Sequence, residues 1–383
     1  MKKVVCMLVF NEMISDARVI KEAKTLSENN YKVIILSFKN NDQNFFERKL
    51  KFLIIHIKFI FRKKPNLFLR IILLFEILFK MMKLLLRIKP DIIHCHDIQP
   101  IYVAWLATKI LKCKLVYDSH ELEYDRNISK SLKPINRFYE KLFINRADQI
   151  IVSDGKYRAK IMIEKSDCIK PITYIKNHFP YNGKINPKIS LTDLLNLDTD
   201  QIVIIYVGNL MEGRGIQNIL SILKKNSEIS LAILGLNYKS LMSNFSDYQI
   251  VSSRIYFLDP VHFLEIPNYC FGAKFGLALI ENVCLSYYYS LPTKLFDYIA
   301  SGVPILASNF PGIKEVVEDN LIGPIGVCVN PLDLEDTLSG VEKILNKENN
   351  LYFKKNIELV HKRLFNWEIQ EKKLINLYSE LLR

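Results

Sequence analysis

The sequence predicts an α/β protein made of two parallel-sheet domains, and three features support this class. With 383 residues, the chain is too long for one ordinary hydrophobic core and fits two domains. Strand-like apolar runs alternate with helical periodicity from the N-terminus onward, and a second series of the same kind starts at Gln201. Between the two series, residues 177–188 are rich in Asn, Gly, Pro and Lys, as in a linker. We therefore expect domains at 1–188 and 189–364, followed by an amphipathic helix within 365–383.

In each half, short apolar runs are followed by segments with apolar residues at helical spacing. The first half is expected to contain strands at 4–10, 31–37, 91–97, 114–121, 149–152 and 172–175, with helices at 15–30, 71–87, 101–110 and 155–164. The second half is expected to contain strands at 201–207, 230–234, 255–258, 275–279 and directly after Pro304, with helices at 216–223, 263–270, 292–301 and 367–382.

The composition is that of a globular protein, with 49% hydrophobic and 24% charged residues. Seven cysteines are scattered without a Cys-x-x-Cys pair, so neither a disulfide framework nor a zinc site is indicated. This usage fits a reducing cytoplasm. The apolar N-terminus lacks a small-residue cleavage site and is interpreted as the first buried strand rather than a signal peptide.

The net charge of +13 implies an acidic partner, and its position narrows the choice. Segment 45–89 holds twelve basic residues and two acidic ones, so ten of the thirteen excess charges lie there. No apolar run in it reaches the length of a membrane span. Two interpretations stay open: a basic amphipathic surface on an anionic bilayer, or a core helix with its polar stripe in water. No nucleic-acid motif accompanies the charge.

Polar residues end two of the expected strands, at the sheet edge where ligands of open parallel sheets gather. His94 and His96 alternate along one strand, but no third ligand is spaced to join them, so hydrogen bonding is favoured over zinc. His120 is a candidate for proton chemistry because Asp118 and Glu121 flank it and can orient its ring. The alternative is a strand-end histidine that bonds a loop carbonyl.

A glycine-rich turn follows the first strand of the second half. Gly208, Gly213 and Gly215 let backbone amides approach a phosphate, and Arg214 can supply a forked cation. The spacing matches neither a Walker loop nor the dinucleotide fingerprint, and a plain glycine turn is the alternative.

The stretch from Ser290 to Ser308 predicts a short helix and then a buried strand. Pro292 suits a first helical position, and Ser290 or Thr293 can cap the neighbouring amides. Lys294 beside the helix start and Asp297 one turn later suit an anion and a polyol, the two features of a nucleotide. The alternative is an ordinary helix that joins two strands.

Together and in order, these motifs resemble the retaining, nucleotide-sugar-dependent glycosyltransferases of family 4, which have the GT-B fold. The motifs that carry the likeness are Asp16-Ala17-Arg18-Val19 with Glu22-Ala23, His96-Asp97, Tyr117 to Glu121, Gly208 to Gly215, Pro292 to Tyr298 and Gly302-Val303-Pro304. The resemblance implies two Rossmann-like domains facing across a cleft, with 1–188 binding the acceptor and 189–364 the nucleotide sugar. It also implies that helix 365–383 packs back on the first domain.

The resemblance implies roles for individual residues. Those expected at the donor are Gly208, Asn209, Gly213, Arg214, Gly215, Tyr289, Pro292, Thr293, Lys294 and Asp297. Those expected on the acceptor side are Asp16, Arg18, His96, Asp97, His120 and Glu121, and those expected in catalysis are His120, Arg214 and Lys294. Asn209 stands where the family often has an arginine. Asp297 replaces the ribose-binding glutamate, and Tyr289 replaces the glutamate that contacts the donor sugar.

The resemblance further implies transfer with retained anomeric configuration, without a cofactor or catalytic metal. The acceptor is expected to be a lipid-linked saccharide or a growing cell-surface polysaccharide such as lipopolysaccharide or capsule. We expect a cytoplasmic enzyme attached peripherally to the inner face of the cell membrane through segment 45–89, with no nucleic-acid partner. Two alternatives stay open: a sugar-nucleotide 2-epimerase, and a non-catalytic GT-B subunit, which Tyr289 and Asn209 favour.

Overall fold

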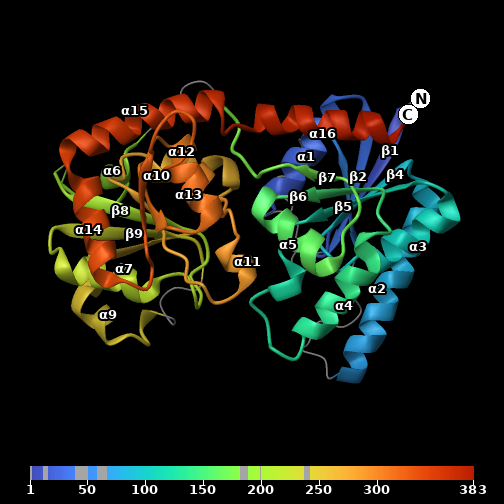
Figure 1. Ribbon diagram of the computed structural model, residues 1–383, viewed down its shortest axis with the longest axis horizontal. Coiled ribbons are helices and arrows are strands. Elements are labelled where there is room, and N and C mark those ends of the chain that lie inside the picture. Colours follow the sequence, from blue (N-terminus) through green and yellow to red (C-terminus); the bar gives the residue numbers. More distant parts are fainter. Residues whose placement is uncertain are drawn as a thin grey trace. The chain divides into compact units, whose positions relative to one another are not determined.

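The computed structural model divides the chain into two compact units (Figure 1). It describes residues 2–11, 16–38, 51–57, 67–181, 189–198, 200–236 and 242–383, and side chains within these except those of 67–74. The N-terminal unit comprises Met1–Lys176 with Gln370–Arg383, and the C-terminal unit comprises Asn177–Ile369. The division therefore falls ahead of the expected linker rather than at residue 188. The reason is that the linker begins inside the C-terminal unit, where the His178 ring packs 4.4 Å from that of Phe296.

The N-terminal unit contains a parallel sheet in the order β3-β2-β1-β4-β5-β6-β7. Its strands are β1 (Lys3–Leu8), β2 (Tyr31–Phe38), β3 (Leu53–Ile57), β4 (Ile92–His96), β5 (Lys114–Ser119), β6 (Gln149–Val152) and β7 (Ile172–Tyr174). Its helices include α1 (Ala17–Glu28), α2 (Leu67–Ile88), α3 (Ile101–Leu111), α4 (Lys133–Ile144) and α5 (Lys156–Ser166). Strand β3 and helix α4 were not predicted from the sequence. In register, Val5 of β1 lies between Val33 of β2 and Ile92 of β4.

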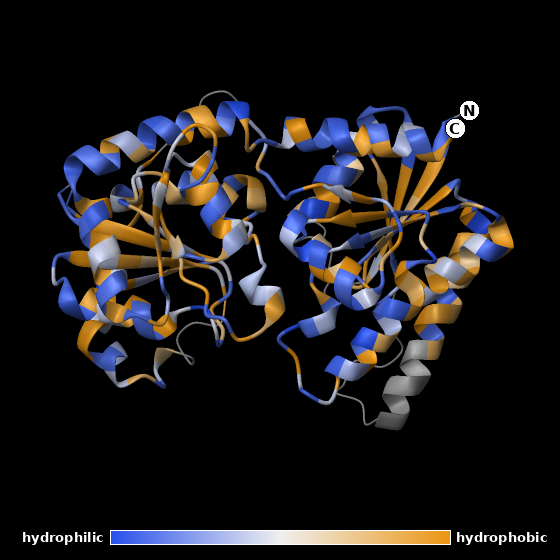
Figure 2. Cartoon of the chain, viewed as in Figure 1, coloured by the Kyte–Doolittle hydropathy of each residue, from blue (hydrophilic) through white to orange (hydrophobic). Residues whose placement is uncertain are grey.

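The expected periodicity explains the core of this unit. Val19, Ala23 and Leu26 of α1 recur at helical spacing and are fully buried. The helix begins after Asp16, whose carboxylate accepts a hydrogen bond from the Val19 N–H at 3.3 Å. Figure 2 shows the strands of each sheet as mainly hydrophobic, as expected of parallel strands covered on both faces.

The C-terminal unit contains a second parallel sheet, in the order β10-β9-β8-β11-β12-β13. Its strands are β8 (Ile202–Val207), β9 (Ile229–Leu234), β10 (Ile255–Leu258), β11 (Gly276–Ala278), β12 (Ile305–Ser308) and β13 (Gly326–Val329). Its helices include α6 (Leu191–Leu194), α7 (Ile216–Lys225), α9 (Ser246–Val251), α10 (Ile266–Cys270), α11 (Leu285–Tyr288), α12 (Lys294–Ala300), α13 (Pro311–Val317), α14 (Leu334–Leu345) and α15 (Lys347–Arg363). The predicted class, two Rossmann-like parallel-sheet domains, is confirmed.

Helix α12 is anchored under the middle of this second sheet by Tyr298. The Tyr298 hydroxyl accepts a hydrogen bond from the Val207 N–H at 3.1 Å and donates to the Leu277 carbonyl at 3.1 Å. A Cβ at Gly276 would lie 2.6 Å from the Tyr298 ring, so the glycine provides the room for it. These contacts set the position of Lys294 at the start of the helix relative to the ends of β8 and β11.

Helix α16 (Trp367–Leu381) starts in the C-terminal unit and packs on the N-terminal one from Gln370 onward. Gln370 Oε1 accepts a hydrogen bond from the Lys176 N–H at 3.0 Å. Leu374 and Tyr378 on the same face are fully buried. Both chain termini lie close together in this unit (Figure 1). Of the helices that the structure describes, none is long and apolar enough to cross a membrane.

Candidate functional site

Each sheet has a topological switch point, and polar groups gather at the carboxyl ends of the strands there. The order reverses between β1 and β4 in the first sheet and between β8 and β11 in the second. Crevices outside these strand ends are where open α/β sheets bind ligands. We therefore describe one cluster in each unit.

Asp118 at the end of β5 is the centre of the cluster in the N-terminal unit. Its carboxylate accepts hydrogen bonds from Arg18, from Nε at 2.7 Å and from Nη2 at 2.8 Å. Arg18 also donates to the Ile175 carbonyl at 2.6 Å and pairs with Glu22 at 3.1 Å. Asp118 is 0% exposed and Arg18 is 2% exposed. Burial alone would raise the pKa of Asp118, but Arg18 and His120 hold it well below its usual range, so the carboxylate stays ionised.

His120 lies directly beyond β5, with its ring against this carboxylate. Its Nε2 is 3.1 Å from Asp118 Oδ2, and its backbone N–H donates to Asp97 Oδ1 at 3.0 Å. The His120 carbonyl accepts a hydrogen bond from Arg158 Nη1 at 2.5 Å, which fixes the backbone. Burial alone would lower the pKa of His120, but Asp97 and Asp118 raise it to about 10. The ring is therefore cationic at neutral pH and suited to donating a hydrogen bond rather than accepting a proton.

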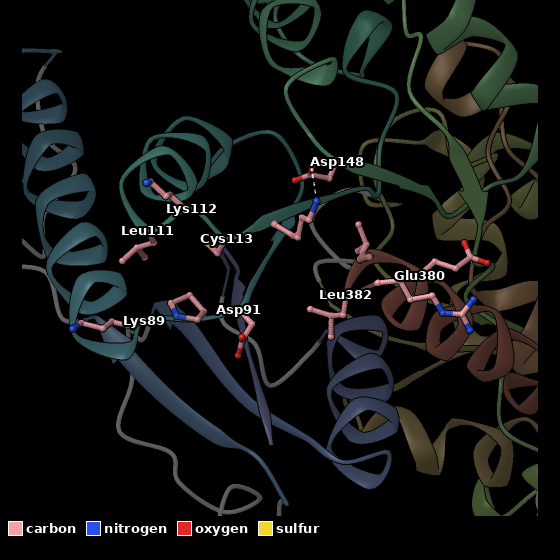
Figure 3. Close-up of a pocket in the computed structure, with 12 residues that line it drawn as sticks. Lys89, Asp91, Leu111, Lys112, Cys113, Asp148, Glu380 and Leu382 are labelled. Atoms are coloured by element: carbon pink, nitrogen blue, oxygen red, sulfur yellow. Dashed lines mark ion pairs between the residues drawn. The ribbon is translucent and has the colours of Figure 1, made fainter. Parts of the chain in front are cut away.

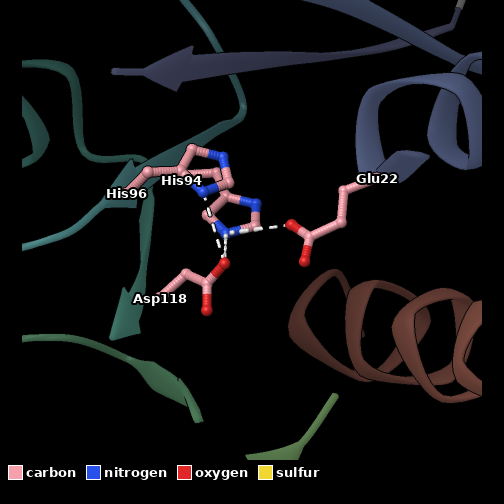
Figure 4. Close-up of side chains that lie close together, drawn as sticks. All are labelled: Glu22, His94, His96 and Asp118. Carbon is pink, nitrogen blue, oxygen red and sulfur yellow. Dashed lines mark ion pairs between the residues drawn. The ribbon is translucent and has the colours of Figure 1, made fainter. Parts of the chain in front are cut away.

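Four buried side chains of this cluster, Glu22, His94, His96 and Asp118, place potential ligand atoms within 4.8 Å of one another (Figure 4). His94 Nε2 lies 3.6 Å from Glu22 Oε2 and 3.8 Å from Asp118 Oδ2. The guanidinium of Arg18 already pairs with both carboxylates. A divalent cation among them would face this positive charge at short range. We therefore assign the four residues to a charge network held by Arg18.

Tyr378 of α16 joins this network from the other end of the chain. Its hydroxyl lies 2.7 Å from His94 Nδ1, and its ring meets Tyr31 edge-on at 5.5 Å. Burial raises the pKa of Tyr378 well above its usual value and lowers the pKa of His94, so the hydrogen bond joins two neutral groups. His94 thus forms a hydrogen bond, as expected, but the expectation that no third ligand joins His94 and His96 is wrong, because Glu22 and Asp118 reach them from other elements of the fold. No sequence pattern pointed to Tyr378 as the partner of His94.

The structure brings most of the expected acceptor-side residues into this cluster. Those in or beside it are Asp16, Arg18, His96, Asp97 and His120. Glu121 contributes its backbone carbonyl, which accepts a hydrogen bond from the Ser119 hydroxyl at 2.8 Å. Glu22 and Arg158 also belong to the cluster and were not among the expected site residues. Glu22 stands one helical turn after Arg18, which is a spacing that an ion-pair search would find.

In the C-terminal unit, the glycine-rich turn after β8 packs tightly against the segment after β11. Gly208 and Gly215 have left-handed φ angles of 104° and 71°. A Cβ at Gly215 would lie 2.5 Å from the Leu279 carbonyl oxygen, so a larger residue would force the chains apart. The Gly213 carbonyl accepts a hydrogen bond from the Glu281 N–H at 3.0 Å. The turn is therefore held at the switch point of the sheet.

Two cations meet at this turn. Lys294 Nζ lies 3.4 Å from the centroid of the Tyr206 ring, and Arg214 Cζ lies 4.2 Å from that of Tyr287. In the part of the chain that the structure describes, neither cation pairs with a carboxylate. Burial, and then the charge of Arg214, hold the pKa of Lys294 well below its usual value. An anion bound at this turn would stabilise both charges.

The start of α12 differs from its expected form. The helix begins at Lys294, so the prediction that Pro292 occupies the first helical position is wrong. Thr293 precedes the helix with helical φ and ψ of −55° and −34° and forms no capping hydrogen bond, because a side-chain cap requires extended backbone. Ser290 does not cap the helix either, since its hydroxyl donates to the Tyr287 carbonyl at 2.8 Å.

The remaining expected donor residues surround this turn. Asp297 lies one turn into α12 and is 9% exposed. Tyr289 is half-buried, with its ring 4.9 Å from that of Tyr288. Asn209 is exposed, and its side-chain oxygen accepts a hydrogen bond from the Leu236 N–H at 3.2 Å. The side-chain amide of Asn209 therefore links the segments that follow β8 and β9.

A pocket of about 670 Å³ lies elsewhere in the N-terminal unit, between the end of α16 and the amino ends of β4, β5 and β6 (Figure 3). Three side-chain carboxylates line it, those of Asp91, Asp148 and Glu380, and the first two have structural partners. Asp91 accepts hydrogen bonds from the Val4 N–H at 2.8 Å and from Lys3 at 2.9 Å, and Asp148 accepts one from the Leu115 N–H at 2.8 Å. The pocket therefore belongs to the edge of the sheet opposite the candidate site.

The fold, with its two Rossmann-like sheets and polar strand ends, defines a protein of GT-B type. Two family models match the chain: Glycosyltransferase Family 4 over residues 17–162 and Glycosyl transferases group 1 over residues 191–359. The chain belongs to the glycosyltransferase family that these two models describe, family 4 in the first half and group 1 in the second.

Similar sequences and structures agree with this assignment. An uncharacterised glycosyltransferase of Methanocaldococcus jannaschii is 23% identical over 304 residues, which are 76% of this chain and 75% of the relative. Sucrose-phosphate synthase of Thermosynechococcus elongatus superposes with a TM-score of 0.78 at 16% identity, covering 100% of this chain and 99% of its own. HepE of Anabaena, solved with UDP-glucose, superposes with a TM-score of 0.76 at 13% identity, covering 98% and 99%. At these identities, the two solved structures show the fold alone.

Proposed function

We propose that the protein transfers a sugar from a nucleotide-sugar donor to a saccharide acceptor, with retention of the anomeric configuration. The acceptor is lipid-linked or a growing cell-surface polysaccharide. The observation that carries the proposal is the pair of cations, Arg214 and Lys294, which meet at the carboxyl end of β8 and form no ion pair with a carboxylate among the described residues. The names of similar proteins add support: HepE is described with UDP-glucose, and a 22% identical protein of Klebsiella pneumoniae is encoded in a cps region.

In this proposal, the C-terminal unit holds the donor by its diphosphate. As the glycosidic bond to phosphate breaks, negative charge grows on the departing phosphate oxygens. Arg214 and Lys294 stabilise that charge without a metal, because both cations are already in place before the reaction. Asp297, one turn beyond Lys294, accepts hydrogen bonds from the ribose hydroxyls. The donor phosphate takes the proton of the acceptor hydroxyl.

The N-terminal unit binds the acceptor at the cluster around Asp118. His120 is cationic there, so it donates a hydrogen bond to an oxygen of the sugar or acceptor rather than removing a proton. Asp16 and Asp97 offer carboxylate oxygens to acceptor hydroxyls. Burial alone would raise the pKa of Asp16, but His120 and the Asn11 amide hold it below its usual value, so this carboxylate stays ionised.

The proposal predicts that a nucleoside diphosphate raises the melting temperature of the protein. Ligand at one hundred times its Kd stabilises the folded state by about 2.7 kcal/mol, equivalent to a shift of roughly 5 to 10 °C. A thermal-shift screen with UDP, GDP, ADP, CDP and dTDP measures it. The matched nucleosides are the controls, because without phosphates they cannot engage the two cations. Equal shifts with nucleoside and nucleoside diphosphate would contradict the phosphate assignment.

Assays of the purified protein distinguish a transferase from a 2-epimerase and from a non-catalytic subunit. Release of nucleoside diphosphate that depends on a saccharide acceptor indicates a transferase. Conversion of the nucleotide sugar without any acceptor indicates a 2-epimerase. Binding of nucleoside diphosphate without any turnover indicates a non-catalytic subunit, for which the structural use of the Asn209 amide is the supporting observation.

We further propose that helix α2 attaches the protein to an anionic membrane. Ile77, Met81 and Leu85 face the core and are buried, as a core helix requires. The opposite side, which we call the outer face of α2, exposes Phe75, Phe79, Lys83, Leu86 and Arg87. Phe75 is 67% and Phe79 is 70% exposed. The buried side is that of a core helix, and the apolar and basic residues of the outer face support the proposed membrane attachment. The basic residues Arg48, Lys49, Lys58, Arg62, Lys63 and Lys64 lie outside the described residues.

We expect the protein to sediment with vesicles rich in phosphatidylglycerol and to be released by salt. A basic side chain near an anionic surface contributes about 1 kcal/mol, so Lys83→Gln with Arg87→Gln is expected to weaken binding roughly ten- to thirtyfold. Phe79→Ser should weaken it at any ionic strength. Leu321→Ser is the matched control, because Leu321 is 92% exposed but lies in the C-terminal unit. Vesicle binding unchanged in the α2 variants would exclude this face.

A further inference from the structure

The two cations of the candidate donor site, Lys294 and Arg214, each lie over a buried tyrosine ring, Tyr206 and Tyr287 respectively. Tyr206 in β8 is 1% exposed, and Tyr287 in α11 is 6% exposed. The hydroxyl of Tyr206 donates to the Asn209 carbonyl at 3.3 Å, and that of Tyr287 donates to Met211 Sδ at 3.2 Å. Both rings are thus held in place independently of Lys294 and Arg214, which lie over them.

We propose that Tyr206 and Tyr287 are positioning residues that hold Lys294 and Arg214 ready for an anionic ligand. The inference rests on the proposed function, since it concerns the same diphosphate site. It adds that the affinity of the site depends on aromatic side chains that do not themselves contact the phosphates.

The physical reason lies in the difference between a tyrosine ring and a carboxylate as partner of a cation. A carboxylate would neutralise the cation and repel the incoming phosphate, so binding would first have to break an ion pair. A ring attracts the cation through its quadrupole while carrying no net charge. Burial raises the pKa of Tyr206 to about 12, so this ring stays neutral. Lys294 is therefore restrained in position, and among the described residues no ion pair has to break before a phosphate can meet it.

The surrounding residues are arranged so that the rings fit. A Cβ at Gly213 would lie 3.1 Å from Tyr287 Cε2 and 3.0 Å from Val283 Cγ2, so glycine leaves space beside this ring. A Cβ at Gly208 would lie 4.0 Å from Lys294 Nζ, which places the ammonium group beside the glycine-rich turn. The glycines of the turn therefore make room for the tyrosine that holds Arg214, as well as for close approach of a phosphate.

The test measures binding of UDP, or of whichever nucleoside diphosphate shifts the wild-type melting temperature most, by isothermal titration calorimetry. Tyr206→Phe keeps the ring and is expected to bind within about twofold of wild type. Tyr206→Leu keeps apolar bulk but removes the ring, and is expected to bind roughly 5- to 30-fold more weakly. In a Lys294→Met background, Tyr206→Leu should cause no further loss, because its effect acts through Lys294. Tyr287 and Arg214 are tested by the same pairs of variants.

Three results would overturn the inference. The first is wild-type affinity in Tyr206→Leu. The second is an equal loss in the phenylalanine and leucine variants, which would indicate the hydroxyl or general packing. The third is the same loss with and without Lys294. Melting temperatures without ligand show whether each variant is folded. If the wild-type protein binds no nucleoside diphosphate, the proposed function fails as well, which distinguishes that outcome from the failure of the tyrosines alone.

Discussion

Replacing Lys294 with methionine is expected to lower sugar transfer by a factor of roughly 10² to 10³. The side chain is 7% exposed and meets Arg214 beside the glycine-rich turn, so its loss removes one of two cations that face the developing phosphate charge. Methionine retains the unbranched apolar stem and can still pack over Tyr206. The measurement is nucleoside diphosphate release with a saccharide acceptor. Arg214→Met is expected to behave alike.

The matched control is Lys314→Met on α13, which removes an exposed lysine from the same unit. It should retain wild-type turnover, so a general effect of net charge is separated from the effect of position. Wild-type turnover in Lys294→Met would refute the placement of the donor phosphates at this turn. Loss of turnover with unchanged nucleotide affinity would instead place Lys294 at the transition state only.

Replacing Arg18 with methionine is expected to destabilise the N-terminal unit by about 3 to 5 kcal/mol. The buried carboxylates of Asp118 and Glu22 would both lose the guanidinium that pairs with them. An unpaired buried charge costs more than the ion pair contributes, because it cannot be rehydrated. Hydrogen exchange of the β4 and β5 amides measures the effect within this unit, apart from the C-terminal one.

Two further variants test whether an unpaired buried charge causes the loss of stability in Arg18→Met. Arg87→Met, on the outer face of α2, removes an exposed arginine from the same unit and should leave exchange unchanged. Combining Arg18→Met with Asp118→Asn replaces one of the unpaired buried carboxylates by a neutral amide and should restore part of the stability. If hydrogen exchange in Arg18→Met equalled that of the wild type within experimental error, the cluster around Asp118 would contribute no net stability.

Much of the fold follows from short-range patterns in the sequence. Apolar runs at the correct spacing predicted the strands that start near Lys3, Tyr31, Ile92, Lys114 and Ile202, because burial on both faces requires continuous apolar residues. The elements missed in the N-terminal unit were β3, whose apolar run lies inside the basic segment, and α4, which exposes the apolar Ile135 and Phe138 and buries the charged Glu140, so that residue type does not mark its buried face. The capping prediction for Thr293 failed because capping depends on backbone angles that residue types alone do not determine.

The clustering of polar residues was predictable where they follow a strand. His120 and Asp97 stand at strand ends, and parallel strands bring such residues to one edge of a sheet. The roles that the family resemblance implies for the donor and acceptor residues remain predictions, which the variants above would test.

By itself, the sequence determined the class of fold, the two series of strands and helices, and the glycine-rich turn that carries Arg214. Only the tertiary structure decided which groups meet. In the folded chain, Tyr378 contacts His94, which is 284 residues away, Arg18 pairs with Asp118, and Lys294 lies over the ring of Tyr206. The physical reason is that periodicity and turn chemistry act between residues a few positions apart. The charge state of His120 and the pairing of Lys294 with an aromatic ring instead depend on which buried groups the finished packing brings within a few ångströms.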